Sequence, residues 1–143
     1  MPNTFDHVHL KSPDPGKTAQ WYVKAFGFRI LSDVMRVDSG DPNTSFGDRM
    51  IRCETVDGTG VIISGRCVTG SRAGERLGRG NASVHWGLEH IGFKVGNLDA
   101  EIQRLADLGA DLLEGPVSYP KTKTRVAFLK GPDNVRFELI ERS

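Results

Sequence analysis

Two histidines, His7 and His90, lie in nearly the same local sequence, and each could bind a metal ion through an imidazole nitrogen. Each is preceded by an acidic residue, followed by an aliphatic residue, and has a lysine four positions later. A helical pattern and a glycine-led apolar stretch come next, with Gly27 20 residues after His7 and Gly109 19 residues after His90. This internal repeat predicts two modules of one architecture, each placing a histidine on its opening strand.

Glu138 could add a carboxylate to the same site. Side chains alternate along a strand, so Glu138 shares a face with Arg136 and Ile140, whereas residues 137 and 139 point to the opposite face, under a helix. Because those two neighbours are apolar, the carboxylate of Glu138 is costly to bury unless it has a partner. A metal ion would be one partner; Arg136 or a lysine would be another.

Together, His7, His90 and Glu138 would supply two neutral imidazoles and one carboxylate. Gly92, two residues after His90, leaves open space on the side of that histidine. The ligand set suits one divalent ion, Fe(II), Mn(II), Ni(II) or Zn(II), with coordination positions left for water or substrate. The same residues could instead be ordinary hydrogen-bonded side chains of two strands.

Further residues could act on a substrate bound at this ion. His9 shares a strand face with His7, so it is a candidate proton shuttle, and a polar wall residue is the alternative. Glu138 would take part in catalysis as a ligand. Arg125 or Arg136 could hold a substrate carboxylate, and Phe128 could line the substrate site.

The bulk composition excludes several classes of partner. At 143 residues, with 38% hydrophobic and 26% charged residues, the chain is typical of an ordinary globular protein. A net charge of +1 provides no field for nucleic acid or for an anionic membrane. No apolar run is long enough to span a bilayer, the first residues do not resemble a signal peptide, and two cysteines form no disulfide framework. We therefore expect a cytoplasmic protein whose partner is a small molecule.

Local signals place the elements that must position these side chains. In the first module we expect a helix that starts after Asp14 and ends at Gly27, and a turn at residues 57–58. In the second, Asn97 is expected to start the helix and residues 115–116 to end a short strand. The expected strands are residues 5–12, 28–37, 49–56, 60–64, 88–95, 110–113, 125–130 and 135–142.

The order of strand, helix and three strands occurs twice. One helix per four strands favours an α+β fold over a doubly wound sheet. We expect a first module over residues 1–65, a linker over residues 66–86 that could double as a lid, and a second module over residues 87–143. Together the modules would make one domain.

The chain resembles the vicinal oxygen chelate superfamily, which includes glyoxalase I, fosfomycin-resistance thiol transferases, bleomycin-resistance proteins and extradiol dioxygenases. The resemblance covers nearly the whole chain and is carried by residues 6–8, 21–22, 26–28, 89–91, 131–134 and 137–141. It implies two βαβββ modules that form a curved mixed sheet around a central cavity with a divalent metal. It also implies His7, His90 and Glu138 as ligands, and a homodimer in which two subunits share each site.

The sequence also departs from parts of that superfamily. Glyoxalase I has a further Glu or Gln ligand on the fourth strand of the first module, where this chain has Val61, Ile62 and Ile63. The open alternatives are a lyase or isomerase that stabilises an enediolate, and a ring-cleaving dioxygenase with Fe(II). A different class is a binding protein that sequesters a planar compound, with Trp86, Phe93 and Phe128 as stacking walls.

Overall fold

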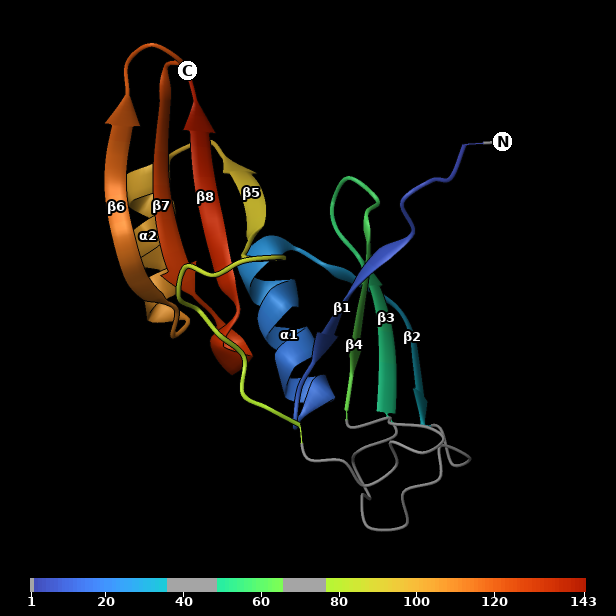
Figure 1. The fold of residues 1–143 in the computed structure, drawn as a ribbon. Helices are drawn as coiled ribbons and strands as arrows, with labels where there is room; N and C mark the ends of the chain where they lie inside the picture. The colour runs from blue at the N-terminus through green and yellow to red at the C-terminus, as the bar shows by residue number, and fades with distance from the viewer. Residues whose placement is uncertain (1, 36–48, 66–76) are drawn as a thin grey trace. The chain divides into compact units, whose positions relative to one another are not determined.

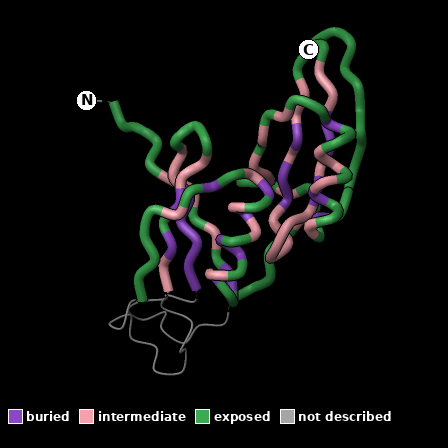
Figure 2. The backbone as a smooth tube through the Cα atoms, turned by 180° about the vertical axis from the view of Figure 1, so that it is seen from behind, coloured by how far each residue is buried: buried purple, intermediate pink, exposed green. Residues whose placement is uncertain are grey.

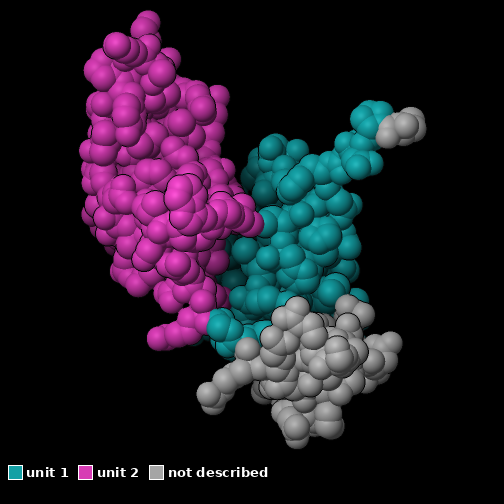
Figure 3. All heavy atoms as spheres, viewed as in Figure 1, with its two compact units in different colours: residues 1–78 teal, residues 79–143 magenta. Residues whose placement is uncertain are grey.

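The structure is a computed structural model that describes residues 2–35, 49–65 and 77–143. The chain divides into two compact units, residues 1–78 and 79–143, coloured separately in Figure 3. Among the residues described, each unit contains one four-stranded mixed sheet and one α-helix, which Figure 1 draws with their labels. The end of the strand expected at residues 28–37 and most of the expected linker, residues 66–76, lie outside the described residues.

In unit 1, a parallel pair and an antiparallel hairpin share one sheet of order β1-β4-β3-β2. Strand β1 runs parallel to β4, and the other neighbours are antiparallel. The elements are β1 (His7–Lys11), α1 (Pro15–Phe26), β2 (Arg29–Met35), β3 (Arg49–Glu54) and β4 (Gly60–Ser64).

Helix α1 begins and ends where the sequence predicts. The Asp14 side chain accepts a hydrogen bond from the backbone N–H of Lys17 at 3.1 Å, which caps the first turn. Gly27 ends the helix in the left-handed conformation, with φ of 68°, which a side chain disfavours. The helix packs on β3 and β4, and its buried Tyr22 and the buried Ile63 of β4 belong to the core that Figure 2 colours purple.

Unit 2 repeats this arrangement with the order β5-β8-β7-β6, and β5 runs parallel to β8. Asn97 caps its helix through a hydrogen bond from the backbone N–H of Ala100 at 3.0 Å. The two units share element order and sheet order, so the predicted α+β class with two βαβββ modules is confirmed. The elements are β5 (Ile91–Val95), α2 (Leu98–Asp107), β6 (Asp111–Tyr119), β7 (Thr124–Lys130), the short helix η2 (Pro132–Asn134) and β8 (Arg136–Arg142).

The apolar layer of unit 2 lies between its helix and its sheet. Leu98 and Leu105 of α2 are fully buried, and so are Phe137 and Leu139 of β8. The alternation predicted for the last strand is therefore confirmed, and it leaves Glu138 on the face away from the helix. Among the described residues, none of the helices is long and apolar enough to cross a membrane.

The prediction of a short strand at residues 110–113 is wrong in its length, because β6 runs from Asp111 to Tyr119. The Gly115-Pro116 pair does not end it. β6 is an edge strand, and its register with β7 shifts between Leu112 and Glu114 and again before Val117. An edge strand with such irregularities tolerates a proline that a central strand would exclude. The strand therefore continues past Pro116 to Tyr119.

The segment before β5 has neither helix nor strand from residue 77 to residue 90. It nevertheless contacts the sheet of unit 2, because the carbonyl of Ala82 accepts a hydrogen bond from Nη1 of Arg136 on β8 at 3.1 Å. His85 fastens the segment internally, with its ring nitrogens 2.6 Å from the Ser83 carbonyl and 2.8 Å from the Leu88 carbonyl. The residues that lead into β5 are therefore held by specific contacts.

Candidate metal centre

Two of the three predicted ligands meet within unit 2. His90 comes just before β5, and Glu138 lies on the adjacent parallel strand β8, where it pairs with Gly92. His90 Nε2 is 3.1 Å from Glu138 Oε2, and the two side chains are 32% and 20% exposed. The contact therefore joins two half-buried groups that 48 residues of sequence separate.

The spacing of these donor atoms fits a shared ion. Two ligands at about 2.1 Å from one metal lie about 3.0 Å apart at a right angle and about 3.4 Å apart at a tetrahedral angle. The observed separation of 3.1 Å falls within this range. It also fits a hydrogen bond, so a metal ion would take the place of the proton that the two groups share.

Gly92 leaves room beside the carboxylate. A Cβ atom built at this glycine would lie 3.7 Å from Glu138 Oε2, and a larger side chain would occupy the space next to that oxygen. This is the open side that the sequence predicts for His90.

The other ring nitrogen of His90 faces a second carboxylate. His90 Nδ1 is 3.0 Å from Glu89 Oε1, and this hydrogen bond is the main cause of a lowered pKa for Glu89. Arg136 lowers the pKa of Glu89 further through its charge. Sequence reasoning missed Glu89 because adjacent side chains of a regular strand point to opposite faces, whereas this pair lies in the irregular backbone before β5.

Arg136 is a buried cation with several internal contacts. Its side chain is only 4% exposed, its Nε lies 3.1 Å from Glu89 Oε1, and its Nη2 donates to Glu114 Oε1 at 2.8 Å. Its guanidinium carbon also lies 4.3 Å from the centre of the Phe128 ring. The structure thus gives Arg136 protein partners, where the sequence predicts a substrate carboxylate.

The two remaining predicted substrate contacts lie on opposite faces of β7. Phe128 pairs with Glu138 across the sheet, and its ring centre is 5.2 Å from that of His90 in an edge-to-face arrangement. Arg125 projects toward α2, where its guanidinium donates two hydrogen bonds to Asp99 at 3.0 and 3.1 Å. This contact raises the pKa of Arg125 and lowers the pKa of Asp99. The structure therefore brings Phe128, and not Arg125, to the His90–Glu138 pair.

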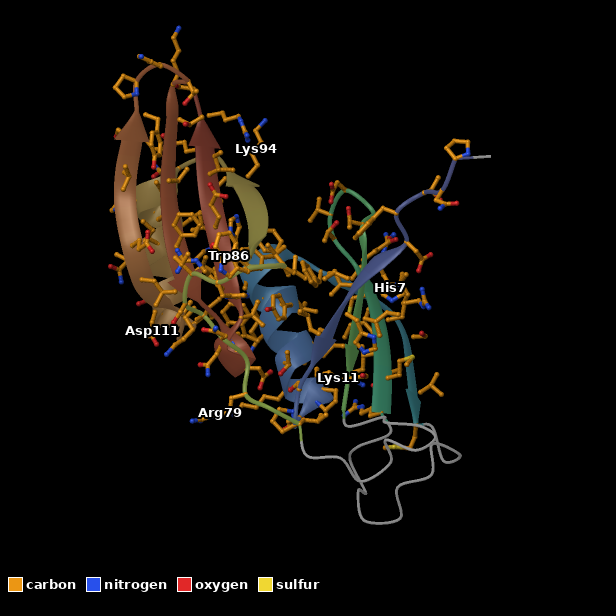
Figure 4. All side chains as sticks on the ribbon, in the orientation of Figure 1. His7, Lys11, Arg79, Trp86, Lys94 and Asp111 are labelled. Carbon is orange, nitrogen blue, oxygen red and sulfur yellow. The ribbon has the colours of Figure 1, made fainter. Side chains whose placement is uncertain are left out.

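In unit 1, His7 opens β1, as Figure 4 shows. His7 Nδ1 is 2.5 Å from Asp6 Oδ2, which repeats the contact between Glu89 and His90. The hydrogen bond to His7 is the main cause of a lowered pKa for Asp6. Both histidines predicted as ligands thus have the preceding carboxylate at Nδ1.

His9 lies on the same face of β1, with its ring centre 6.2 Å from that of His7. Its Nε2 is 2.7 Å from the Oγ atom of the fully buried Ser64, and the same Oγ accepts a hydrogen bond from Lys11 Nζ at 3.0 Å. Burial lowers the pKa of His9, and the charges of Lys11 and His7 lower it further. Ser64 was not predicted, because only the pairing of Lys11 with Ser64 in the parallel ladder brings it to His9.

The strand register also identifies the residue of unit 1 that corresponds to Glu138 of unit 2, which is the position where glyoxalase I has its further ligand. Glu138 pairs with the residue two places after His90, and Ile62 pairs with the residue two places after His7. Ile62 is buried and its side chain has no donor atom. Within the described ranges of one chain, no three His, Cys, Asp or Glu side chains lie close enough together to hold an ion. Two predicted ligands are adjacent in unit 2, and the third belongs to unit 1.

Comparison with known proteins identifies related sequences and folds. A sequence model of the glyoxalase/bleomycin resistance protein/dioxygenase superfamily matches residues 4–139. An uncharacterised protein of Bacillus subtilis, YwkD, is 27% identical over 139 residues, which is 97% of each chain. Glyoxalase I of Saccharomyces cerevisiae is 23% identical over 97% of this chain, which spans 45% of the yeast enzyme. The fosfomycin resistance protein FosX of Listeria monocytogenes, solved in complex with Mn(II) and sulfate, shares the fold with a TM-score of 0.65. The two sequences are 16% identical, and the match covers 100% of this chain and 95% of FosX.

Proposed function

Because the chain belongs to the glyoxalase/bleomycin resistance protein/dioxygenase superfamily, we propose that it is a divalent-metal-dependent enzyme. Its substrate is a small, oxygen-rich molecule that binds the ion through two neighbouring oxygens. The protein ligands are His7, His90 and Glu138, and the ion is Fe(II), Mn(II), Ni(II) or Zn(II). The contact between His90 Nε2 and Glu138 Oε2 at 3.1 Å carries the proposal.

The charge around that contact supports a cation. His90, Arg136 and three carboxylates form one connected network, in which Glu89 contacts both His90 and Arg136, Glu114 contacts Arg136, and Glu138 contacts His90. With a neutral imidazole, the network has three negative charges and one positive charge. A divalent ion would balance this excess, and the half-buried setting strengthens the attraction relative to open water.

A bound ion would polarise the two chelating substrate oxygens and stabilise negative charge that develops on them. His9 would move a proton at the substrate. Its lowered pKa keeps the imidazole neutral at neutral pH, and Ser64 Oγ fixes the ring through Nε2. Phe128 would form an apolar wall beside the His90 imidazole.

Two reaction classes fit three protein ligands. One is lyase or isomerase chemistry through an enediolate; the other is ring cleavage by oxygen with Fe(II). The sequence of YwkD and the fold of FosX do not choose between them. Oxygen uptake on a panel of catechols after anaerobic loading with Fe(II) separates the classes, since only the dioxygenase consumes oxygen.

Metal analysis tests the proposal. The full chain is stripped with a chelator and titrated separately with the four ions, and we expect stoichiometric binding of at least one. His90→Ala and Glu138→Ala should each abolish stoichiometric binding. Asp99→Asn, which removes a carboxylate on the α2 side of the same unit, should bind like the wild type. Wild-type protein that retains none of the four ions would refute the proposal.

The ligand set takes one residue from unit 1 and two from unit 2. We further propose that the protein is a homodimer in which each ion is bound by unit 1 of one copy and unit 2 of the other.

A second candidate function is sequestration of a planar compound. The side chain of Trp86 favours it, because the residue is 99% exposed and an indole is a good stacking surface. Phe93, by contrast, packs edge-to-face on the buried Phe137. Quenching of tryptophan fluorescence by planar aromatic compounds in metal-free protein, lost in Trp86→Phe and retained in Trp21→Phe, would favour this function over catalysis.

A further inference from the structure

We infer that Glu89 and Asp6 are positioning residues of the metal centre. Each carboxylate holds Nδ1 of the ligand histidine that follows it and so presents Nε2 to the ion, and the buried Arg136 anchors Glu89. The inference rests on the proposed function, because it assigns roles toward the same ion.

The contact between a histidine and the carboxylate before it has the same geometry in both units. His90 Nδ1 lies 3.0 Å from Glu89 Oε1, and His7 Nδ1 lies 2.5 Å from Asp6 Oδ2. The two contacts occur at equivalent places, immediately before the paired part of β5 and at the start of β1. A side-chain contact between adjacent residues is not a property of regular strands, so its occurrence in both units indicates a shared requirement.

The chemistry of the imidazole decides which ring nitrogen can bind the ion. A neutral histidine has one N–H donor and one nitrogen lone pair, and only the lone pair can bind a metal. Both ring nitrogens of His90 face a carboxylate, Glu89 at Nδ1 and Glu138 at Nε2. An ion bound at Nε2 would use the lone pair of that nitrogen, so the single proton of the neutral ring would lie on Nδ1, where Glu89 accepts it. In His90 it is Nε2 that lies 3.1 Å from the other predicted ligand, Glu138. The carboxylate of Glu89 also increases the basicity of the ring and fixes its orientation.

Arg136 forms an ion pair with Glu89. The Nε atom of Arg136 lies 3.1 Å from the Glu89 oxygen that contacts His90. Arg136 itself is held by Glu114 and by the carbonyl of Ala82. The contact between Arg136 and Glu89 is an ion pair and not a hydrogen bond, because Nε has no hydrogen-bond partner among the described residues. A guanidinium that is 4% exposed and held at its two other nitrogens has little freedom to move, so its charge attracts Glu89 from a fixed position.

Asp6 has weaker support than Glu89. Its side chain is 77% exposed, against 25% for Glu89. Arg52 acts on it only through its charge. The inference therefore predicts unequal effects, with a larger loss of affinity on removing Glu89 than on removing Asp6.

The experiment measures the affinity of the metal-free full chain for Zn(II) by competition with a chelator. Glu89→Ala should weaken binding about 10- to 100-fold, the range typical of such supporting carboxylates. Glu89→Gln should lie between Glu89→Ala and the wild type, because an amide oxygen still accepts from Nδ1. Asp6→Asn should have a smaller effect than Glu89→Gln. Glu101→Gln is the matched control, since Glu101 is a glutamate of similar exposure that pairs with Arg104 on α2.

A spectroscopic measurement tests the tautomer directly. In the Zn(II)-loaded protein, which is diamagnetic, long-range ¹H–¹⁵N correlations should show the proton of His90 on Nδ1. A metal bound to Nδ1 would overturn the inference whatever the affinities are.

The role of Arg136 is tested by a double-mutant cycle. Lysine can replace the charge of Arg136 but not its several contacts, so Arg136→Lys should weaken Zn(II) binding in the wild type and have little further effect in Glu89→Ala. Circular dichroism and a thermal melt check that each variant is folded.

The possible results distinguish a failure of the proposed function from a failure of the inference alone. Wild-type protein that fails to bind Zn(II) or any of the other three ions overturns both the function and the inference. Tight binding by the wild type and equal binding by Glu89→Ala overturns the inference alone. Equal losses in Glu101→Gln and Glu89→Gln would also overturn it, since they would indicate an effect of charge without positioning.

Discussion

Glu138 and Glu141 lie on the same strand, β8, and face opposite sides of the sheet. Glu138 Oε2 lies 3.1 Å from His90 Nε2, whereas Glu141 Oε2 accepts a hydrogen bond of 2.6 Å from the backbone N–H of Leu98, at the start of α2. Both residues are glutamates, three positions apart on one strand. Substituting each of them alone therefore tests metal binding and fold stability separately.

Glu138→Ala should remove metal binding with little effect on folding, because its carboxylate contacts the imidazole and not the core. Glu141→Ala should leave metal binding intact and lower the free energy of unfolding by about 0.5–2 kcal/mol, the usual value of a helix-capping contact. Metal titration and urea unfolding of both variants check this crossed pattern. Loss of metal in Glu141→Ala at a concentration where the variant is folded would contradict it.

Mixing two inactive variants should restore metal sites if two copies share each site. His7→Ala damages unit 1, and Glu138→Ala damages unit 2. In a mixed dimer one site would receive both defects, and the other would receive neither. We therefore expect one intact site per mixed dimer, measured as bound metal after the two variants are unfolded and refolded together. An unchanged metal content after mixing would place all three ligands in one chain.

Gly92→Val should weaken metal binding while the protein remains folded. A Cβ atom at this position meets Glu138 Oε2 at 3.7 Å, so the additional methyl groups would enter the space beside that oxygen. Gly96→Val is the control, because a Cβ atom at Gly96 has no heavy atom within 4 Å. We expect an affinity for Zn(II) at least about tenfold lower in Gly92→Val, in line with the sensitivity of metal sites to their surroundings, and no comparable loss in Gly96→Val.

The ion pair between Asp33 and Arg49 should make stability depend on pH in acid. Arg49 donates hydrogen bonds to both carboxylate oxygens of Asp33, at 2.9 and 2.6 Å, and these bonds lower the pKa of Asp33. A carboxyl group with a lowered pKa in the folded state stabilises the fold above its unfolded-state pKa, and this contribution disappears as the pH falls through the folded-state pKa.

Asp33→Asn should therefore be less stable than the wild type near neutral pH, and the difference should vanish at a pH below the folded-state pKa of Asp33. The pair is partly exposed, so the difference should be no more than about 1 kcal/mol. Urea unfolding across the acid range measures it. A difference that persists unchanged in strong acid would show that the carboxylate charge is not its cause.

The sequence by itself determined the repeated architecture and the faces of the strands. The two similar histidine segments indicated two modules, Asp14, Gly27 and Asn97 marked helix ends correctly, and the alternation in the last strand placed Glu138 away from the helix. These features follow from local chemistry, because capping, left-handed glycines and strand alternation involve residues close together in sequence.

Only the tertiary structure decided which partners those side chains meet. The parallel ladders bring Ser64 to His9, and the strand register places Ile62 opposite His9 as Glu138 lies opposite Gly92. The structure also turns Arg125 to Asp99 and continues β6 past residues 115–116. Strand periodicity gives a side chain its face but not its neighbour across the sheet. That neighbour depends on register and burial, and these are set when distant segments of the chain pack together.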